Sequence, residues 1–405
     1  MLNQSFSESV FQRSGRTVKR SDSEAVVQRK RSNSTAVIII NMHSRNLTYD
    51  VVKGLGILLV IFAHFSNHWQ IENIFFSFHM PLFILVAGLF DKGEAHIKDF
   101  GKRTRQNAWR LLVPYFGTLI YMCLISWIWD AYTGEETLNR LPLVRLAVST
   151  GDFYATPYGE AWCGPLWFLF ALFITRELFF LLRCGIRNPY SVLLVCTALS
   201  FTASVLYPLL APMAWNPLPG IGMLIFYAIG WFAHQRHIPA IAKVLSIIAW
   251  LAVIYWYLWG GAAAHLDMRT CHANALEVLG ACGGSLLLYG FCRYLLSALE
   301  EVQTWCEHRG WKFAPAPFWT WCGRNSMLIL CVHSFDLVTN KFAFIMNWAT
   351  ALSPWLATLD SAWLALLRAA ITLLVALLID LGLHLFYHLR DRLFPNNLEH
   401  MAQSI

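Results

Sequence analysis

The sequence predicts an all-α integral membrane protein, a bundle of about ten transmembrane helices with both termini in the cytoplasm. Of its 405 residues, 57% are hydrophobic and only 14% are charged, whereas a soluble domain carries about 25% charged residues. The mean hydropathy is +0.48, and apolar stretches close to the ~20 residues that a helix needs to cross a bilayer recur along the chain. The formal charge of +7 lies mainly between these stretches, as the positive-inside rule expects, so it does not indicate a nucleic-acid partner.

Residues 1–44 precede the first apolar stretch. They are rich in Ser, Arg and Lys without an apolar period, which predicts a disordered basic tail. Their apolar run, residues 36–40, is too short for a secretory signal. Met42 stands directly before the membrane region, so Met1 and Met42 are both candidate translation starts. We expect a membrane domain over residues 45–395 and a C-terminal tail over residues 396–405.

Ten apolar spans follow this tail. The first runs from about Asp50 to Trp69 and the second ends near Phe90, and the short polar turn between them makes the two helices neighbours. The basic segment from Asp91 to Arg110 comes next and belongs on the cytoplasmic side. The remaining spans are predicted at 111–129, 165–182, 190–210, 218–232, 241–259, 273–296, 325–345 and 362–387.

The charges between the spans predict the orientation. With the N-terminus inside, each inner connection carries cations, whereas the outer ones are poor in them. The outer cations Arg140 and Arg145 are offset by nearby carboxylates. Ten spans with both termini in the cytoplasm therefore satisfy the positive-inside rule, and an odd number of spans would break the alternation.

The first two spans each carry a histidine where the apolar pattern favours a leucine, His64 and His79. Ionisable residues inside a bilayer are costly and are therefore candidates for function. Lys53 lies eleven residues before His64, a separation that returns to nearly the same helical face and spans roughly 16 Å along the axis. One face of this helix is thus expected to carry a cation near the membrane surface and an imidazole about three turns deeper.

A third histidine, His333, falls near the middle of the ninth span, and we expect a cavity lined by His64 and His79 with His333 as a candidate for its floor. Desolvation disfavours a charged imidazole, and a neutral ring can accept a proton from a hydroxyl.

Three cations are placed at the cytoplasmic side: Lys53, Arg105 and Arg110. Lysine and arginine bind phosphate groups as charged donors, so these residues are candidates to bind a phosphate-bearing ligand. Asp50 precedes Lys53 by one helical turn and is expected to pair with it in a supporting role.

Five segments of the sequence form a recognisable series. They are the arrangement of Asp50, Lys53, Gly54 and His64, FHMPLF at 78–83 with Gly88, RLLVPY at 110–115, GPLWFLFALF at 164–173 and GRNSMLILCVH at 323–333. In this order they resemble the acyltransferase 3 family of membrane acyltransferases. The resemblance covers residues 45 to about 390.

The resemblance implies transfer of an acetyl or similar short acyl group from cytoplasmic acyl-CoA to a hydroxyl of a glycan or lipid-linked saccharide. Such a transfer from a thioester to an alcohol needs a base, and the phosphates of the coenzyme A donor would meet Lys53, Arg105 and Arg110 at the cytoplasmic side. It further implies a bacterial inner membrane protein with no bound cofactor. By the same resemblance His64 is the catalytic histidine, Lys53 its basic partner and Arg110 the arginine before the Pro-Tyr pair. Gln106 stands where the family often has a second arginine, with Arg105 beside it. FHMPLF and GLGILLV resemble most the branch that acts on fucose-type and exopolysaccharide sugars.

Several polar groups also have a structural interpretation. His79 could hydrogen bond the carbonyl groups that Pro81 frees. Asp336, one turn after His333, is a candidate to orient the ring of that histidine. We expect Arg176 with Glu177 to form a structural pair inside the bundle, and Glu277, Asp336 and Arg368 to take part in further structural pairs there.

The ten cysteines do not predict a disulfide framework in a chain of this length. Cys163 and Cys271 both fall in predicted outer loops and could form a bridge, although we expect both to be unpaired. His64 and His68 are four residues apart but lack an evident third ligand, so no metal site is predicted.

Two other functions compete with acyl transfer. A transporter or exporter of a glycan precursor or small solute would also suit ten helices with buried charges. Against it, the two halves show no internal similarity and their Gly and Pro breaks do not match. A sensor domain that keeps the fold without activity is disfavoured by the combination of His64 with Lys53.

Overall fold

The computed structural model describes residues 47–66, 68–134, 163–210, 215–259, 266–271, 273–311, 316–339, 346–347, 351, 353 and 361–393. The chain divides into two units, residues 1–47 and 48–405, and the account below concerns the second. The predicted tails at 1–44 and 396–405 lie outside the described residues, as does the connection that carries Arg140 and Arg145.

Every element of three or more residues in the described part of the chain is a helix. They are α2 (Leu47–Ser66), α3 (Trp69–Phe76), α4 (His79–Leu89), η1 (Ile97–Asp99), α5 (Phe100–Thr133), η2 (Gly164–Leu166), α7 (Trp167–Gly185), α8 (Pro189–Leu210), α9 (Leu218–Gly222), α10 (Leu224–Gln235), α11 (Ala240–Trp259), α12 (Ala275–His308), α13 (Ala316–Arg324), α14 (Ser326–Thr339) and α16 (Ser361–Leu393).

Within the described residues, eight helical stretches are long and apolar enough to cross a bilayer, so the chain is a multi-pass helical membrane protein. The two other predicted spans contain shorter helices. In the span at 218–232, α9 is followed by α10, with the break between them at Met223. In the span at 325–345, the structure describes α14, which has 14 residues, and α13 ends just before this span at Arg324. The number ten and the cytoplasmic termini stay predictions.

Two helices extend well past their predicted spans. α5 begins at Phe100 rather than at Leu111, so much of the basic segment is helical rather than a loop. α12 continues to His308, beyond the predicted end at Leu296. Each has 34 residues, which makes it about 51 Å long at the usual rise per residue, whereas the hydrocarbon layer is about 30 Å thick.

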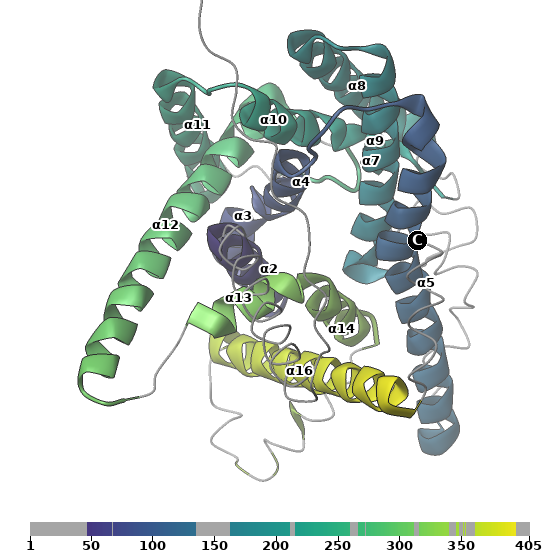
Figure 1. Cartoon of the computed structure of the whole chain (residues 1–405), viewed down its shortest axis with the longest axis vertical. Coiled ribbons are helices and arrows are strands. Elements are labelled where there is room, and N and C mark those ends of the chain that lie inside the picture. The colour runs from purple at the N-terminus through teal and green to yellow at the C-terminus, as the bar shows by residue number, and fades with distance from the viewer. Residues whose placement is uncertain are drawn as a thin grey trace, which may run out of the picture. The chain divides into compact units, whose positions relative to one another are not determined.

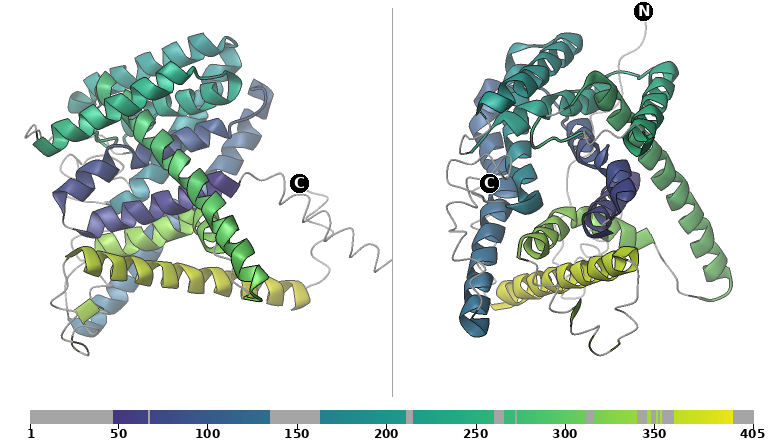
Figure 2. Two further views of the ribbon diagram at one scale, coloured as in Figure 1. Left: turned by 90° about the vertical axis from the view of Figure 1, so that its left-hand side faces the viewer. Right: turned by 180° about the vertical axis from the view of Figure 1, so that it is seen from behind.

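Helix α2 lies between α12 on one side and α5 on the other (Figure 1 and Figure 2, right). Its burial explains this place: consecutive residues from Asp50 to Val52, and then Gly54, Gly56 and Ile57, are buried on more than one face of the helix. A helix that is apolar on every side lies inside a bundle rather than on its surface. The residues that the sequence analysis selects on α2 are therefore in the interior.

Helix α4 packs very closely against α10 because glycines face each other's backbone. A Cβ atom on Gly88 would lie 2.1 Å from the carbonyl oxygen of Tyr227, and one on Gly230 would lie 2.1 Å from that of Leu85. Small residues at such crossings let two membrane helices approach backbone to backbone. This contact holds α4, which carries His79, in the centre of the fold.

Candidate active site

A cavity of about 540 Å³ lies among α2, α4, α7, α14 and the loop at 266–271. Along α2 it extends from Lys53 to His64, which corresponds to roughly 16 Å of helix. Most of its wall is apolar. Its charged and imidazole side chains are Lys53 and His64 from α2, His79 from α4, Arg176 from α7, and Asp267 and Arg269 from the loop.

His64 is partly buried near the end of α2, and its Nδ1 lies 2.8 Å from the carbonyl oxygen of Val60, one turn earlier. Because a carbonyl oxygen only accepts hydrogen bonds, Nδ1 carries the hydrogen and donates it. The Nε2 atom of the neutral ring then keeps its lone pair, and it has no hydrogen-bond partner among the described residues. His64 therefore presents a proton acceptor in the cavity wall.

His79 is the first residue of α4 and is 7% exposed. The helix breaks at Ser77 and Phe78, and the carbonyl oxygen of Phe75 accepts two hydrogen bonds there: one from the backbone N–H of Phe78 at 3.2 Å and one from Nδ1 of His79 at 3.0 Å. The observed partner differs from the structural interpretation of His79, because in a helix Pro81 frees the carbonyl of Ser77 and not that of Phe75. His79 also lines the cavity. Its ring centroid is 6.4 Å from that of His64, and Phe76 lies 4.9 Å from each of them.

His333 lies behind His64 rather than in the cavity wall. The two ring centroids are 5.2 Å apart, and His333 is fully buried. Neither ring nitrogen of His333 has a hydrogen-bond partner among the described residues. The structure thus brings the three predicted histidines together, two of them in the cavity wall.

Asp336 does not orient the ring of His333. Its buried carboxylate accepts two hydrogen bonds from Arg368 of α16, one from Nε and one from a terminal nitrogen at 2.9 Å. The guanidinium group of Arg368 in turn lies over the ring of Phe65, 4.0 Å from its centroid. A charged, two-pronged donor outcompetes a neutral imidazole for a carboxylate. Asp336 and Arg368 were both expected to take part in structural pairs, and they pair with each other.

The expected pair between Asp50 and Lys53 is also confirmed, at 3.0 Å. Arg324, which the sequence analysis did not select, adds a second cation 3.6 Å from the same carboxylate. α13 can come this close to α2 because residue 323 is glycine: a Cβ atom there would lie 1.7 Å from the carbonyl oxygen of Asp50. The available signal was the GRNSM segment itself, whose arginine follows the contact glycine.

Arg105 and Arg110 are exposed on α5 and do not line the cavity. The inward face of this helix carries the buried residues Asn107, Leu111 and Tyr115 at intervals of four. Arg105 is two residues from Asn107 and lies almost opposite this face, and Arg110 lies one residue from Leu111, about 100° away. Donor binding by these two arginines stays a prediction, and neither of them contributes to the cavity wall.

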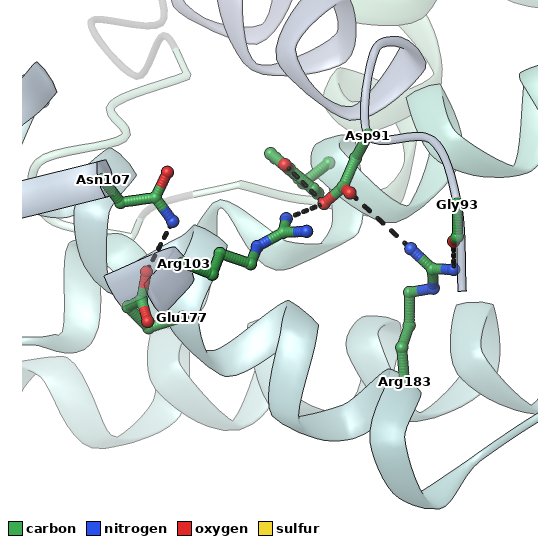
Figure 3. Close-up of polar contacts among 7 residues, drawn as sticks. Asp91, Gly93, Arg103, Asn107, Glu177 and Arg183 are labelled. Carbon is green, nitrogen blue, oxygen red and sulfur yellow. Dashed lines mark hydrogen bonds and ion pairs between the residues drawn. The ribbon is translucent and has the colours of Figure 1, made fainter. Parts of the chain in front are cut away.

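Arg103 lies on the inward face of α5 instead, in a polar cluster with Asp91 and Arg183 (Figure 3). Tyr227 also belongs to this cluster. Asp91 is 5% exposed and pairs with both arginines, and it also accepts a hydrogen bond from the hydroxyl of Tyr227 at 2.9 Å. Arg183 donates to the carbonyl of Gly93 as well. The cluster joins α5, α7 and α10 to the segment that follows α4.

Arg176 was expected to pair with Glu177, and this expectation is wrong. Glu177 accepts hydrogen bonds from Thr104 and from Asn107, the latter at 2.6 Å (Figure 3). Adjacent residues of a helix point about 100° apart and do not face each other. Arg176 points to the cavity, and in the described part of the chain it has no ion pair or hydrogen bond.

Asp267 and Arg269 were also missed as site residues, although Arg269 is one of few cations in the predicted outer loops. Their side chains form an ion pair at 3.2 Å and line the cavity with His64. Tyr257 fixes the loop, since its hydroxyl accepts from the backbone N–H of Leu266 at 3.1 Å and donates to Glu277 at 2.7 Å. A single helix-capping residue, Glu277, thus helps to position the loop.

All ten cysteines are outside disulfide bonds, including Cys163 and Cys271. The carbonyl of Cys271 accepts a hydrogen bond from Ser204, and burial raises the pKa of its thiol to about 12. The absence of the optional bridge agrees with the sequence-based expectation.

A family model described as "Acyltransferase domain" matches residues 46–381. The nodulation protein NolL of Mesorhizobium japonicum is 25% identical over 267 residues, which cover 60% of this chain and 65% of that protein. The nodulation protein NolL of Sinorhizobium fredii is 26% identical over 151 residues, which cover 34% of this chain and 37% of that protein. The chain thus spans less than two thirds of the length of these curated relatives. No solved structure gives a significant match.

Proposed function

The chain belongs to the acyltransferase family that this model describes, and from this premise we propose that it transfers an acetyl or similar short acyl group from cytoplasmic acyl-CoA to a hydroxyl of a cell-surface or exported glycan. The acyl-CoA is a substrate, and the acceptor is a glycan or a lipid-linked saccharide. We place the protein in a bacterial inner membrane, with the start of α2 on the cytoplasmic side.

The observation that carries this proposal is the state of His64. Its Nδ1 is held by Val60, its Nε2 has no partner among the described residues, and the ring lies in the wall of a cavity inside the membrane domain. A positioned neutral imidazole is the side chain that most often removes a proton from an attacking hydroxyl.

The spacing between Lys53 and His64 supports a coenzyme A donor. About a dozen bonds separate the pyrophosphate of coenzyme A from its sulfur, and an extended chain advances about 1.2 Å per bond, so the pantetheine arm reaches about 14 Å. The corresponding length of α2 is roughly 16 Å. When the phosphates lie near Lys53, the thioester can therefore reach His64.

The transfer itself needs one proton acceptor and no redox partner. Nε2 of His64 accepts the proton of the acceptor hydroxyl while the oxygen attacks the thioester carbonyl carbon. A C–O bond forms and the C–S bond then breaks, and the imidazolium returns the proton to the departing thiolate. The products are the ester and free coenzyme A, and His64 is restored.

The loop at 266–271 supports an acceptor that enters from the other side. Asp267 and Arg269 line the cavity with His64 and present a carboxylate and a guanidinium group, which together accept from and donate to sugar hydroxyls. Under the proposed orientation this loop faces away from the cytoplasm. Donor and acceptor would then meet at His64 from opposite sides.

The proposal is tested with inverted membrane vesicles, whose outer surface is the cytoplasmic face, by adding acetyl-CoA with a labelled acetyl group. We expect label in the glycan fraction with the wild-type protein. The His64→Ala variant should lose at least 100-fold in rate, the lower end of the effect of a general base. His68→Ala is the matched control, because His68 follows α2 but does not line the cavity.

Two outcomes would contradict the proposal. Full transfer by His64→Ala at equal protein levels would remove the catalytic role of His64. Export of unlabelled glycan by the wild-type protein without any dependence on acyl-CoA would favour the competing function of a transporter.

A further inference from the structure

Arg176 is a cation in the cavity wall that has no counter-ion among the described residues. It lies in α7 and lines the cavity, its Nε atom is buried, and it has no hydrogen bond or ion pair within the described residues. A guanidinium group taken out of water is costly unless an anion pairs with it. The described part of the chain does not supply this anion.

Two buried carboxylates, one in α7 and one just after α4, already have hydrogen-bond partners. Glu177 bonds Thr104 and Asn107 of α5. Asp91 forms ion pairs with Arg103 and Arg183 (Figure 3) and accepts a hydrogen bond from Tyr227. Of the described residues that line the cavity, Asp267 is the only acidic one, and it pairs with Arg269 in its own loop. The cavity therefore has an excess of positive charge.

Arg176 lies toward the same end of the cavity as Lys53. The next residue, Glu177, accepts a hydrogen bond from Asn107 of α5, one turn after Arg103. Arg103 in turn pairs with Asp91, which lies just beyond the end of α4. At that end of α4, the ring of Phe90 packs edge-on against Tyr49 of α2, with centroids 5.0 Å apart. Lys53 follows Tyr49 by one turn. Two cations from α2 and α7 thus flank the cavity away from His64.

We infer that Arg176, together with Lys53, forms a binding site for a phosphate group, and that this phosphate belongs to the acyl-CoA donor. Arginine binds phosphate oxygens through parallel N–H donors, and a lysine adds a point charge. The inference rests on the proposed function. It assigns to α7 a role that the sequence analysis assigned to Arg105 and Arg110, both of which are exposed and outside the cavity.

A phosphate could also come from a second source, the pyrophosphate of a lipid-linked saccharide. Such an acceptor would approach the end of the cavity that carries His64, whereas Arg176 and Lys53 lie toward the other end. The spacing from Lys53 to His64, which matches a pantetheine arm, also favours the donor. The experiment below distinguishes a phosphate of the donor from a phosphate of the acceptor.

The test compares two donors that differ in their phosphates. Acetyl-CoA carries the phosphates, and S-acetylpantetheine has the same thioester and arm without them. For Arg176→Gln we expect the KM for acetyl-CoA to rise at least tenfold, and the KM for S-acetylpantetheine to stay at its wild-type value. Arg187→Gln is the matched control, since Arg187 is an exposed arginine just beyond α7, and it should change neither.

Three results would overturn the inference: an equal rise in KM for both donors, no rise for either, or a rise confined to the KM for the acceptor. The last result would assign the phosphate to the acceptor. Arg176→Lys is a second variant that keeps the charge, and we expect it to raise the KM for acetyl-CoA less than Arg176→Gln does. Size-exclusion chromatography of each variant in detergent checks that it is folded.

Binding of free coenzyme A, measured by calorimetry, separates this inference from the proposed function. If the wild-type protein binds coenzyme A but transfers no acetyl group, the proposed reaction fails and the site can still be tested. Weaker binding by Arg176→Gln would then support the phosphate site. Unchanged binding by that variant would refute it.

Discussion

The Nδ1 atom of His64 lies 2.8 Å from the main-chain carbonyl oxygen of Val60, one turn earlier in α2. A ring nitrogen bound to a carbonyl oxygen must carry the hydrogen, so this contact selects one of the two neutral tautomers. The Nε2 atom is then the one that can accept a proton. The position of a histidine in a helix and its ring orientation together determine its chemistry here.

The first prediction concerns this tautomer. In protein labelled with 15N-histidine, we expect the difference between the wild-type and His64→Ala spectra to show a protonated Nδ1 and an unprotonated Nε2. The measurement is 15N NMR of the protein in membranes at neutral pH. A difference spectrum with a protonated Nε2 and a bare Nδ1 would contradict the assignment of His64 as the base.

The second prediction concerns His79, which lines the cavity but whose ring centroid is 6.4 Å from that of His64. We expect His79→Phe to keep the ring packing and to lower kcat/KM about tenfold, which corresponds to one lost hydrogen bond of about 1.4 kcal/mol. The acetyl-transfer assay measures this. A loss as large as that of His64→Ala would mean that both rings are essential to the proton transfer.

The third prediction concerns the loop at 266–271. Asp267→Asn keeps the size of the side chain but removes the charge, so we expect a higher KM for the glycan acceptor and an unchanged KM for acetyl-CoA. The two KM values are obtained separately from initial rates, by varying the concentration of one substrate at a time. The opposite pattern, with a higher KM only for acetyl-CoA, would place the donor rather than the acceptor against this loop.

The fourth prediction concerns stability. Arg368→Met leaves the buried carboxylate of Asp336 without its charged partner, and removing one member of a buried pair costs roughly 3–5 kcal/mol. We expect a lower unfolding temperature in detergent, measured by thermal denaturation. The double variant Asp336→Leu/Arg368→Met removes both charges and should recover most of the loss. A double variant as unstable as the single one would show that the pair contributes through packing.

The fifth prediction concerns Cys271, whose buried thiol has its pKa raised to about 12. A thiol is protonated below its pKa, so at pH 8 only about one molecule in 10⁴ carries the reactive thiolate, and the fraction rises only as the pH approaches 12. We expect no maleimide labelling of Cys271 at pH 8 in membranes and complete labelling after denaturation, as read by peptide mass spectrometry. Rapid labelling in the native protein would contradict the burial.

The sequence by itself determined the class of the protein and the part of its site that α2 contributes, Lys53 and His64. Hydropathy separates apolar from polar stretches, and helical periodicity relates residues within one helix. For this reason the membrane fold, the pair of Asp50 with Lys53 and the shared face of Lys53 and His64 could be derived from short-range spacing alone. The family resemblance then gave His64 its chemical meaning.

Only the tertiary structure decided which residues of different helices meet. Sequence spacing does not show the rotation of one helix against another, so it could not exclude Arg105 and Arg110 from the cavity or bring in Arg176 and the loop with Asp267. Sequence spacing likewise could not reveal that the carboxylate of Asp336 binds Arg368. His333 is then left without a hydrogen-bond partner in the described part of the chain. These contacts depend on how helices pack, and close packing is set by small residues such as Gly323 that join segments far apart in the sequence.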